Sequence, residues 1–152
     1  MIFSEIRHAS DLYDKSLRLR EQVLRMPLGL TLSAADLADE AQQWHFGLVE
    51  QGDLLAFLVV KPAQKPLAKL RQMAVAPAMQ GRGLGRVLVN ATEQFLRQRG
   101  FDEVMLDARE TAIGFYQALG YCVDGDVFQQ VGIPHRCMRK SLAWPVHAQD
   151  GS

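Results

Sequence analysis

The spacing of apolar residues predicts two long helices. One is expected over residues 83–99 and would end at Gly100. Its apolar positions recur at helical spacing and are Leu84, Val87, Leu88, Ala91 and Phe95. The other helix can be capped by Ser10 or Asp11 and runs to about Arg25. Its apolar residues near one face are Leu12, Leu19, Val23 and Met26. Each helix therefore has a face that can pack on a core.

Runs of apolar and β-branched residues predict about seven strands. They are expected over residues 2–7, 44–50, 54–60, 68–75, 103–108, 121–131 and 135–142, with short helices over 34–41 and 112–119. The turn Gln51-Gly52-Asp53 joins the second and third strands as a hairpin. Strands and helices alternate in the middle of the chain. The sequence therefore predicts one α/β domain (mixed α+β) over residues 1–143, followed by a short flexible tail over residues 144–152.

The composition is that of an ordinary globular protein, with 152 residues, 48% of them hydrophobic and 22% charged. The longest apolar run, residues 54–60, is far too short to span a bilayer. No secretory signal is expected, because residues 1–7 hold no basic region followed by an apolar stretch. The 17 basic and 17 acidic residues balance, so no overall attraction to nucleic acid or to an anionic membrane is expected. We therefore expect a cytoplasmic protein that binds neither.

Charge is nevertheless uneven along the chain. Residues 65–99 hold seven basic residues and one acidic residue, whereas residues 31–53 hold five acidic residues and no basic one. The first segment suits a polyanion and the second a cation, although solvated surface charge is the alternative for most of these side chains. Cys122 and Cys137 are expected to be free thiols. Two cysteines and four scattered histidines have no metal-ligand spacing, so no metal is expected.

A glycine-rich segment lies between the strand at 68–75 and the helix at 83–99. Gly81, Gly83 and Gly85 remove three Cβ atoms, so the main chain can approach a ligand closely. The start of the helix adds free N–H groups and the positive end of its dipole, which together favour a phosphate. A dinucleotide fingerprint would need glycine at Arg86, and a P-loop would need a lysine that this loop lacks. The segment is thus a phosphate site of another kind.

Two motifs resemble the GNAT (GCN5-related N-acetyltransferase) superfamily. Gln80-x-x-Gly83-x-Gly85 follows Val75-Ala76-Pro77, as in that family's pyrophosphate loop. Residues 112–121 resemble the family's A-x-x-F-Y-x-x-x-G-F/Y helix, and residues 128–138 resemble a C-terminal segment of one bacterial branch. The resemblance is strongest over residues 67–121. It implies the acyl-CoA N-acyltransferase fold, a central twisted sheet of about seven mostly antiparallel strands with helices on both faces.

The resemblance implies acetyl transfer from acetyl-CoA to a primary amine in a ternary complex. The main-chain N–H of Val75 or Met73 would stabilise the thioester oxygen, and Tyr116 would act as general acid toward the departing sulfur. Arg109 stands where relatives commonly have Asn. The residues expected at the cofactor are Met73, Ala74, Val75, Gln80, Gly81, Arg82, Gly83, Leu84, Gly85, Arg86, Arg109, Phe115 and Tyr116.

The base and the acceptor stay open at this point. His135, Glu50 and His45 are candidates for deprotonating the amine, with a water relay or capture of the neutral amine as alternatives. The acidic segment 31–53 favours a cationic small molecule or peptide as acceptor, and Arg20 can either form a salt bridge or line the acceptor site. A homodimer is left open. The alternative functions are a non-catalytic CoA-sensing module and, from another class, a nucleotide-binding regulator.

Overall fold

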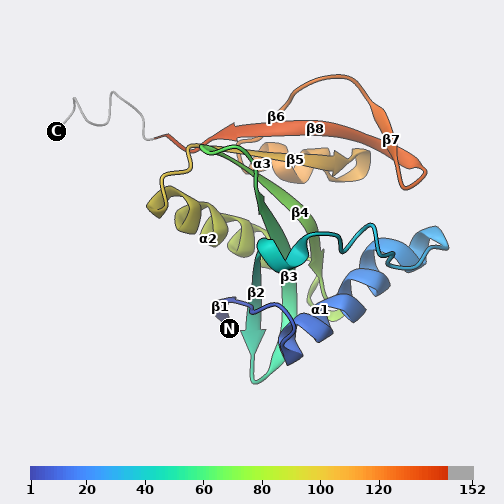
Figure 1. The fold of residues 1–152 in the computed structure, drawn as a ribbon. Helices are drawn as coiled ribbons and strands as arrows, with labels where there is room; N and C mark the ends of the chain where they lie inside the picture. Colours follow the sequence, from blue (N-terminus) through green and yellow to red (C-terminus); the bar gives the residue numbers. More distant parts are fainter. Residues whose placement is uncertain (144–152) are drawn as a thin grey trace. The chain divides into compact units, whose positions relative to one another are not determined.

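The computed structural model describes residues 1–143, so the expected tail at 144–152 lies outside the described residues. Figure 1 shows the course of the chain. It divides into two compact units, described separately below. Unit 1 comprises Met1–Pro62 and Lys69–Thr92, and unit 2 comprises Ala63–Ala68 and the described residues from Glu93 onward. The expectation of a single domain over 1–143 stays a prediction.

Four strands form the framework of unit 1: β1 (Ile2–Glu5), β2 (Trp44–Glu50), β3 (Asp53–Pro62) and β4 (Leu67–Val75). They lie side by side in the order β1-β2-β3-β4, and the β1–β2 and β2–β3 pairs are antiparallel. The β2–β3 turn has φ of 50° at Gln51 and 81° at Gly52. Positive φ at both central residues gives the turn the twist that hairpin strands require. All four predicted strands are confirmed within about two residues.

Helix α1 (Asp11–Arg20) packs against β3, and Ser10 caps it by accepting a hydrogen bond from the N–H of Tyr13 at 3.2 Å. The chain then continues as a π-helical turn, Glu21–Arg25, and a 3₁₀ turn, Met26–Leu28. The prediction of one apolar face as far as Met26 was wrong, because Met26 is 62% exposed. The π turn adds a residue to the helical repeat and changes which side chains face inward. The core cluster of this unit is Ile6, Tyr13, Leu19, Phe57, Val59 and Ala74.

The predicted helix at 34–41 is absent; the structure has turns there and one 3₁₀ turn, Glu40–Gln42. Ser33 and Asp36 bind each other's main chain through their side chains, at 2.9 and 3.2 Å. Such local side-chain hydrogen bonds compete with helical ones. Asp39, at φ of 63°, further interrupts the helical path.

In unit 2, β5 (Glu103–Arg109) pairs antiparallel with β8 (Ile133–Ser141). The short strands β6 (Cys122–Val123) and β7 (Phe128–Gln130) both pair antiparallel with β8. The sequence predicted one strand over 121–131, which was wrong. Gly125 lies between β6 and β7 at φ of 102°, outside the range of strand backbone, and its carbonyl accepts from Arg136. This split raises the number of strands in the described residues from the expected seven to eight.

The two remaining helices, α2 (Leu84–Gln98) and α3 (Ile113–Ala118), confirm the helices predicted at 83–99 and 112–119. Gly100, at φ of 82°, ends α2 with a left-handed cap in which the N–H of Phe101 reaches the carbonyl of Leu96 at 3.0 Å. Within residues 1–143 no helix is long and apolar enough to cross a membrane. The fold is mixed α/β with mostly antiparallel strands, as predicted.

Candidate functional site

The loop between β4 and α2 offers a row of main-chain N–H groups. After a 3₁₀ turn at Pro77–Met79, the chain passes Gly81 and Gly83 at φ of 78° and 79°, a conformation that residues with a Cβ seldom adopt. A Cβ at either glycine would meet nothing within 4 Å, so backbone conformation rather than crowding favours glycine there. The first helical bond runs from the N–H of Val87 to Gly83 O. Within the described chain, the N–H groups of residues 81–86 have no hydrogen-bond acceptor.

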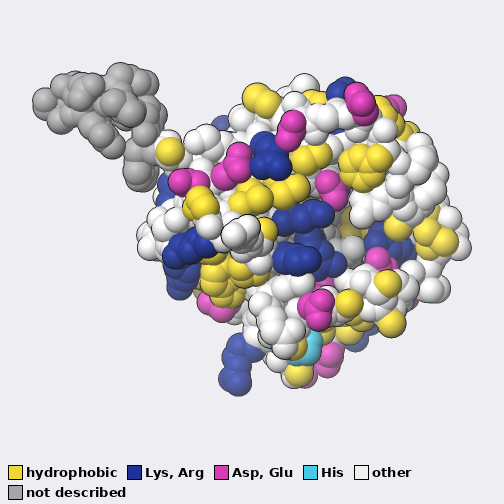
Figure 2. All heavy atoms as spheres, turned by 45° about the horizontal axis from the view of Figure 1, so that its top comes forward, with side chains coloured by type: hydrophobic (Ala, Val, Ile, Leu, Met, Phe, Trp, Pro, Cys, Tyr) yellow, Lys and Arg dark blue, Asp and Glu magenta, His cyan; other side chains and the backbone are white. Residues whose placement is uncertain are grey.

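Side chains around this loop hold it in place and leave its outer surface basic. Gln80 Nε2 donates to Val75 O at 3.1 Å, which ties the loop to the end of β4. Leu84 is buried and anchors the start of α2, whereas the side chains of Arg82 and Arg86 are exposed. Figure 2 shows that basic and hydrophobic side chains are both exposed at the surface. Free amides at a helix start with exposed arginines next to them suit a phosphate group.

Strand β4 contains an irregularity just before this loop. Arg71 contacts Glu40, which also binds α1, and Ala74 packs in the core cluster with Leu19 of α1. On a regular strand, residues three apart face opposite sides. Gln72, at φ of 56°, interrupts the extended backbone between Arg71 and Ala74, and we call this interruption the bulge at Gln72. The stretch that follows contains Met73 and Val75, the two predicted donors to the thioester oxygen.

Tyr116 lies on α3 in unit 2 and is 8% exposed. Its ring packs edge-on against Phe115 and Tyr121, with centroids 4.9 and 5.7 Å away. Burial raises the pKa of Tyr116 to about 12, so the phenol keeps its proton at neutral pH. No other group within residues 1–143 makes a hydrogen bond with its hydroxyl. The Tyr121 hydroxyl, in contrast, donates to Glu93 Oε2 at 2.7 Å.

The three candidate bases lie in different surroundings. His135 is buried in β8 opposite Arg109, and its Nδ1 lies 2.9 Å from Ile133 O. Glu50 lies at the exposed end of β2, 3.4 Å from the N-terminal amine. His45 is buried and its Nε2 lies 2.8 Å from Glu40 O; burial lowers its pKa, which keeps the ring neutral at physiological pH. Their roles as bases stay predictions.

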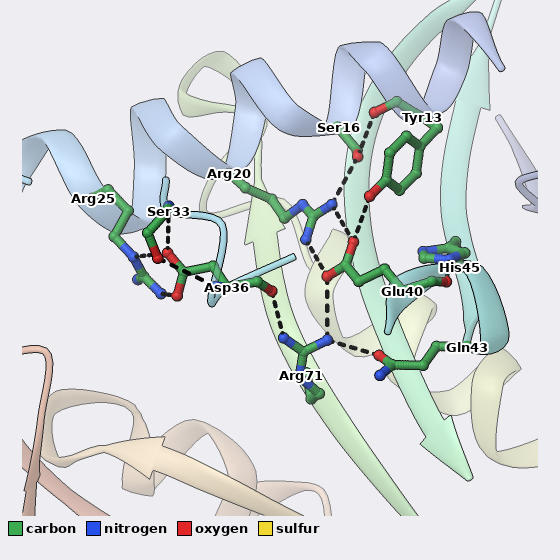
Figure 3. A network of polar contacts seen from close by, with 10 residues as sticks. All are labelled: Tyr13, Ser16, Arg20, Arg25, Ser33, Asp36, Glu40, Gln43, His45 and Arg71. Carbon is green, nitrogen blue, oxygen red and sulfur yellow. Dashed lines mark hydrogen bonds and ion pairs between the residues drawn. The ribbon is translucent and has the colours of Figure 1, made fainter. Parts of the chain in front are cut away.

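A buried ion-pair network in unit 1 was missed by sequence reasoning (Figure 3). Arg20 and Glu40, both with fully buried side chains, form a two-pronged pair at 2.8 and 2.9 Å. The hydroxyl of Tyr13 donates to the same carboxylate at 2.7 Å, and Arg71 Nη1 approaches it at 3.2 Å. These contacts decide between the two expectations for Arg20 in favour of the salt bridge. One feature of the sequence could have indicated a buried polar contact: Ser16 and Arg20 are four residues apart on the helix, next to the apolar Leu19.

This pairing removes much of the basis for expecting a cationic acceptor. Of the five acids in residues 31–53, Glu40 is enclosed by the network and Asp36 binds Arg25 at 2.8 and 3.2 Å. Glu50 approaches the N-terminal amine. Asp39 and Asp53 remain exposed. Three of the five charges therefore already have a cationic partner.

Cys122 is exposed and Cys137 is half-buried, and the two do not form a disulfide. Within residues 1–143, no three His, Cys, Asp or Glu side chains come together in a way that could hold a metal ion.

Comparison with curated proteins finds partial relatives. YyaT of Bacillus subtilis is 33% identical over 76 residues, which is 50% of this chain and 51% of YyaT. The mycothiol acetyltransferase of Thermomonospora curvata is 34% identical over 109 residues, which is 64% of this chain and 36% of that protein. These alignments thus span about half or less of each relative.

Solved structures share the fold over nearly the whole chain. An aminoglycoside 6′-N-acetyltransferase, solved in complex with coenzyme A, matches with a TM-score of 0.76 at 21% identity, covering 95% of this chain and 99% of that one. This likeness confirms the predicted acyltransferase fold. The family model described as the acetyltransferase (GNAT) family matches residues 8–121, from just before α1 to the end of the motif that contains α3. The chain belongs to the acetyltransferase (GNAT) family.

Proposed function

We propose that this protein is an N-acetyltransferase that moves the acetyl group of acetyl-CoA to a primary amine. The observation that carries the proposal is the row of unpaired main-chain N–H groups at residues 81–86, in a chain of the acetyltransferase (GNAT) family. An anionic diphosphate matches both these donors and the exposed Arg82 and Arg86. The coenzyme A complex of a protein with the same fold supports the choice of cosubstrate. The amine, a homodimeric assembly and a cytoplasmic location stay predictions.

In this proposal, the cofactor residues expected from the sequence bind different parts of acetyl-CoA. The N–H groups of residues 81–86 hold the pyrophosphate. The N–H of Gln80 is already paired with Pro77 O at 3.4 Å, so Gln80 contributes by tying the loop to β4 through its side chain. The N–H of Met73 or Val75 polarises the thioester carbonyl. Ala74 and Leu84 have buried side chains, so they would contribute through their main chain. Arg109, Phe115 and Tyr116, which belong to unit 2, stay predictions as contacts to the cosubstrate.

The proposed reaction is direct attack of the neutral amine on the thioester carbon. A C–N bond forms, the carbonyl electrons move to oxygen and return, and the C–S bond breaks to release the CoA thiolate. The amine loses its proton to a base, with His135, Glu50 and His45 as candidates, or to water. Tyr116, with a pKa of about 12, is a weaker acid than a thiol, whose usual pKa is about 8.5. Tyr116 therefore acts chiefly by donating a hydrogen bond to the departing sulfur.

Calorimetric titration with acetyl-CoA tests whether the N–H groups of residues 81–86 bind the cosubstrate, using two matched glycine variants. Gly83→Ala places a Cβ on an unpaired amide loop at φ of 79°, and Gly52→Ala does the same in the β2–β3 turn at φ of 81°. Neither Cβ meets an atom within 4 Å, so we expect both to lose similar stability. Only Gly83→Ala should weaken acetyl-CoA binding, by about tenfold.

A screen for CoA release across polyamines, aminoglycosides, amino acids and peptides then identifies the acceptor. Absence of binding by the unmodified protein, or equal loss of affinity in both glycine variants, would overturn the proposal. Tight binding without turnover of any amine would favour the CoA-sensing alternative instead. Binding of ATP or NAD in preference to acetyl-CoA would favour the nucleotide-binding regulator.

A further inference from the structure

The bulge in β4 places a residue in an unfavourable conformation. Gln72 has a side chain and yet lies at φ of 56°, where residues other than glycine are uncommon. Its Oε1 is buried and has no hydrogen-bond partner within the described chain, so its own side chain does not explain the conformation. Such backbone persists where the surroundings hold it. The question is which contact does so.

The residue before it, Arg71, is fixed at three points (Figure 3). Its Nη1 donates to Glu40 Oε2 at 3.2 Å and to Gln43 Oε1 at 2.8 Å, and its Nη2 donates to Asp36 O at 2.8 Å. All three acceptors belong to residues 36–43, the segment that precedes β2. A planar guanidinium with a rigid set of donors suits such a three-point contact, whereas an ammonium does not.

Residues 36–43 are in turn held to α1 and its π-helical extension. Glu40 receives two hydrogen bonds from Arg20 and one from Tyr13, and Asp36 receives two from Arg25. A continuous set of short polar contacts therefore runs from the first helix through this segment to Arg71 on β4. It ends one residue before the bulge.

Charge balance alone does not account for Arg71. The Glu40 carboxylate is already matched by the fully buried Arg20, and the side chain of Arg71 is 19% exposed and so is not forced to find a partner inside. Arg71 links residues 36–43 to β4. The link lies next to Gln72, where the alternation of side chains between the two faces of β4 is broken.

We propose that Arg71 is a positioning residue for acetyl transfer. It holds the bulge at Gln72 so that the amides of Met73 and Val75 are aimed at the thioester oxygen. The proposal rests on the proposed function, because it assigns this stretch of β4 to acetyl-CoA. Arg71 itself touches neither substrate nor cofactor in this account.

The test compares Arg71→Ala with Arg25→Ala. Arg25 also holds residues 36–43, through Asp36, but none of its hydrogen bonds within the described residues reaches β4, so it controls for simple loosening of the segment. Titration with acetyl-CoA is followed by ¹H–¹⁵N spectra of the full chain. We expect the amide signals of Met73 and Val75 to shift on binding in the unmodified protein and in Arg25→Ala. In Arg71→Ala those two shifts should be lost while that of Gly83 remains.

Turnover provides a second readout, with the amine that the screen identifies. Arg71→Ala should lower kcat by about ten- to a hundredfold, the scale expected for a misplaced reacting group, with less than about a threefold change in the acetyl-CoA KM. Added guanidinium at millimolar concentration should restore part of that loss in Arg71→Ala and none in Arg25→Ala. Should Arg71→Ala fail to fold, Arg71→Lys, which keeps the charge and loses the fork, serves in the same measurements.

Equal behaviour of the Arg71 and Arg25 variants, or unchanged Met73 and Val75 shifts in Arg71→Ala, would overturn this role for Arg71. If the unmodified protein shows no shift with acetyl-CoA at any residue, the proposed function fails instead. The two failures are therefore distinguishable.

Discussion

Two tyrosines of unit 2 show how the same side chain takes different roles according to its partner. Tyr116 and Tyr121 are both buried and pack edge to face. The Tyr121 hydroxyl donates a hydrogen bond to Glu93, whose carboxylate also binds Lys140 at 2.8 Å. The hydroxyl of Tyr116 has no such structural use within the described residues. A buried phenol that the fold does not use is available to a ligand, which supports Tyr116 as the donor to sulfur.

Removing each hydroxyl should therefore have opposite consequences. Tyr116→Phe keeps the packed ring, so we expect unchanged stability and acetyl-CoA affinity but a kcat lowered by about 10²-fold, at the low end for loss of an acid–base group. Tyr121→Phe leaves the buried Glu93 with one donor fewer, so it should lose about 1–3 kcal/mol of stability. Chemical denaturation, calorimetry and steady-state rates of both variants measure this. Unchanged kcat in Tyr116→Phe would contradict its assignment.

At the scale of elements, α1 has a side-chain cap at its start, where Ser10 precedes the first helical residue. Ser10 Oγ accepts from the N–H of Tyr13 at 3.2 Å and donates to Arg7 O at 2.6 Å. At the other end the hydrogen bonding changes through a π turn, and Gly29, at φ of 71°, finally ends the helical path. The start of α1 is therefore the place where one substitution acts on the whole element.

Loss of this cap is expected to destabilise the protein by about 1 kcal/mol in Ser10→Ala. Ser10→Thr keeps both the acceptor and the donor and should cost much less. Urea unfolding of the two variants measures the difference. A Ser10→Ala protein as stable as the unmodified chain would show that the Arg7 and Tyr13 contacts contribute little.

The helix cap at Ser10, the turn at Gly52 and the helix end at Gly100 were predictable because each depends on residues close by in sequence. Ser10, Gly52 and Gly100 each act on neighbours within a few residues, and the hairpin and α2 follow from them. The break between β6 and β7 was missed because apolar residues on both sides of Gly125 suggested one strand. The bulge at Gln72 was missed because no residue type near it requires one.

At the scale of the molecule, partners distant in sequence determine what the charges do. Balanced totals of 17 basic and 17 acidic residues conceal that Glu40 meets Arg20 and Arg71, which lie 20 and 31 positions away. The sequence predicts a phosphate-binding loop because Gly81, Gly83 and Gly85 lie within five consecutive residues. The cationic acceptor inferred from segment 31–53 stays a prediction, and counting charges could not show that Glu40 in this segment is enclosed by arginines. Pairing of this kind also makes stability depend on pH.

Asp36 provides a direct test of that dependence. Hydrogen bonds from Arg25 lower its pKa from 3.8 to about 2, and burial only partly offsets them. Because the folded pKa lies below the unfolded one, the stabilisation is complete above about pH 4 and is lost as the pH falls toward 2. Asp36→Asn should therefore cost about 2 kcal/mol at pH 6, and progressively less as the pH approaches 2. Urea unfolding at pH 6 and at about pH 2.5 measures both values.

Asp39→Asn is the matched control for this measurement. Asp39 is exposed, it lies in the same segment, and its φ of 63° is one that Asn tolerates. We expect its effect on stability to be small and the same at both pH values. A cost of Asp36→Asn that does not change with pH would mean that the ion pair with Arg25 contributes nothing beyond the shape of the turn. In that case the network of Figure 3 would owe its stability to the buried Glu40 pair alone.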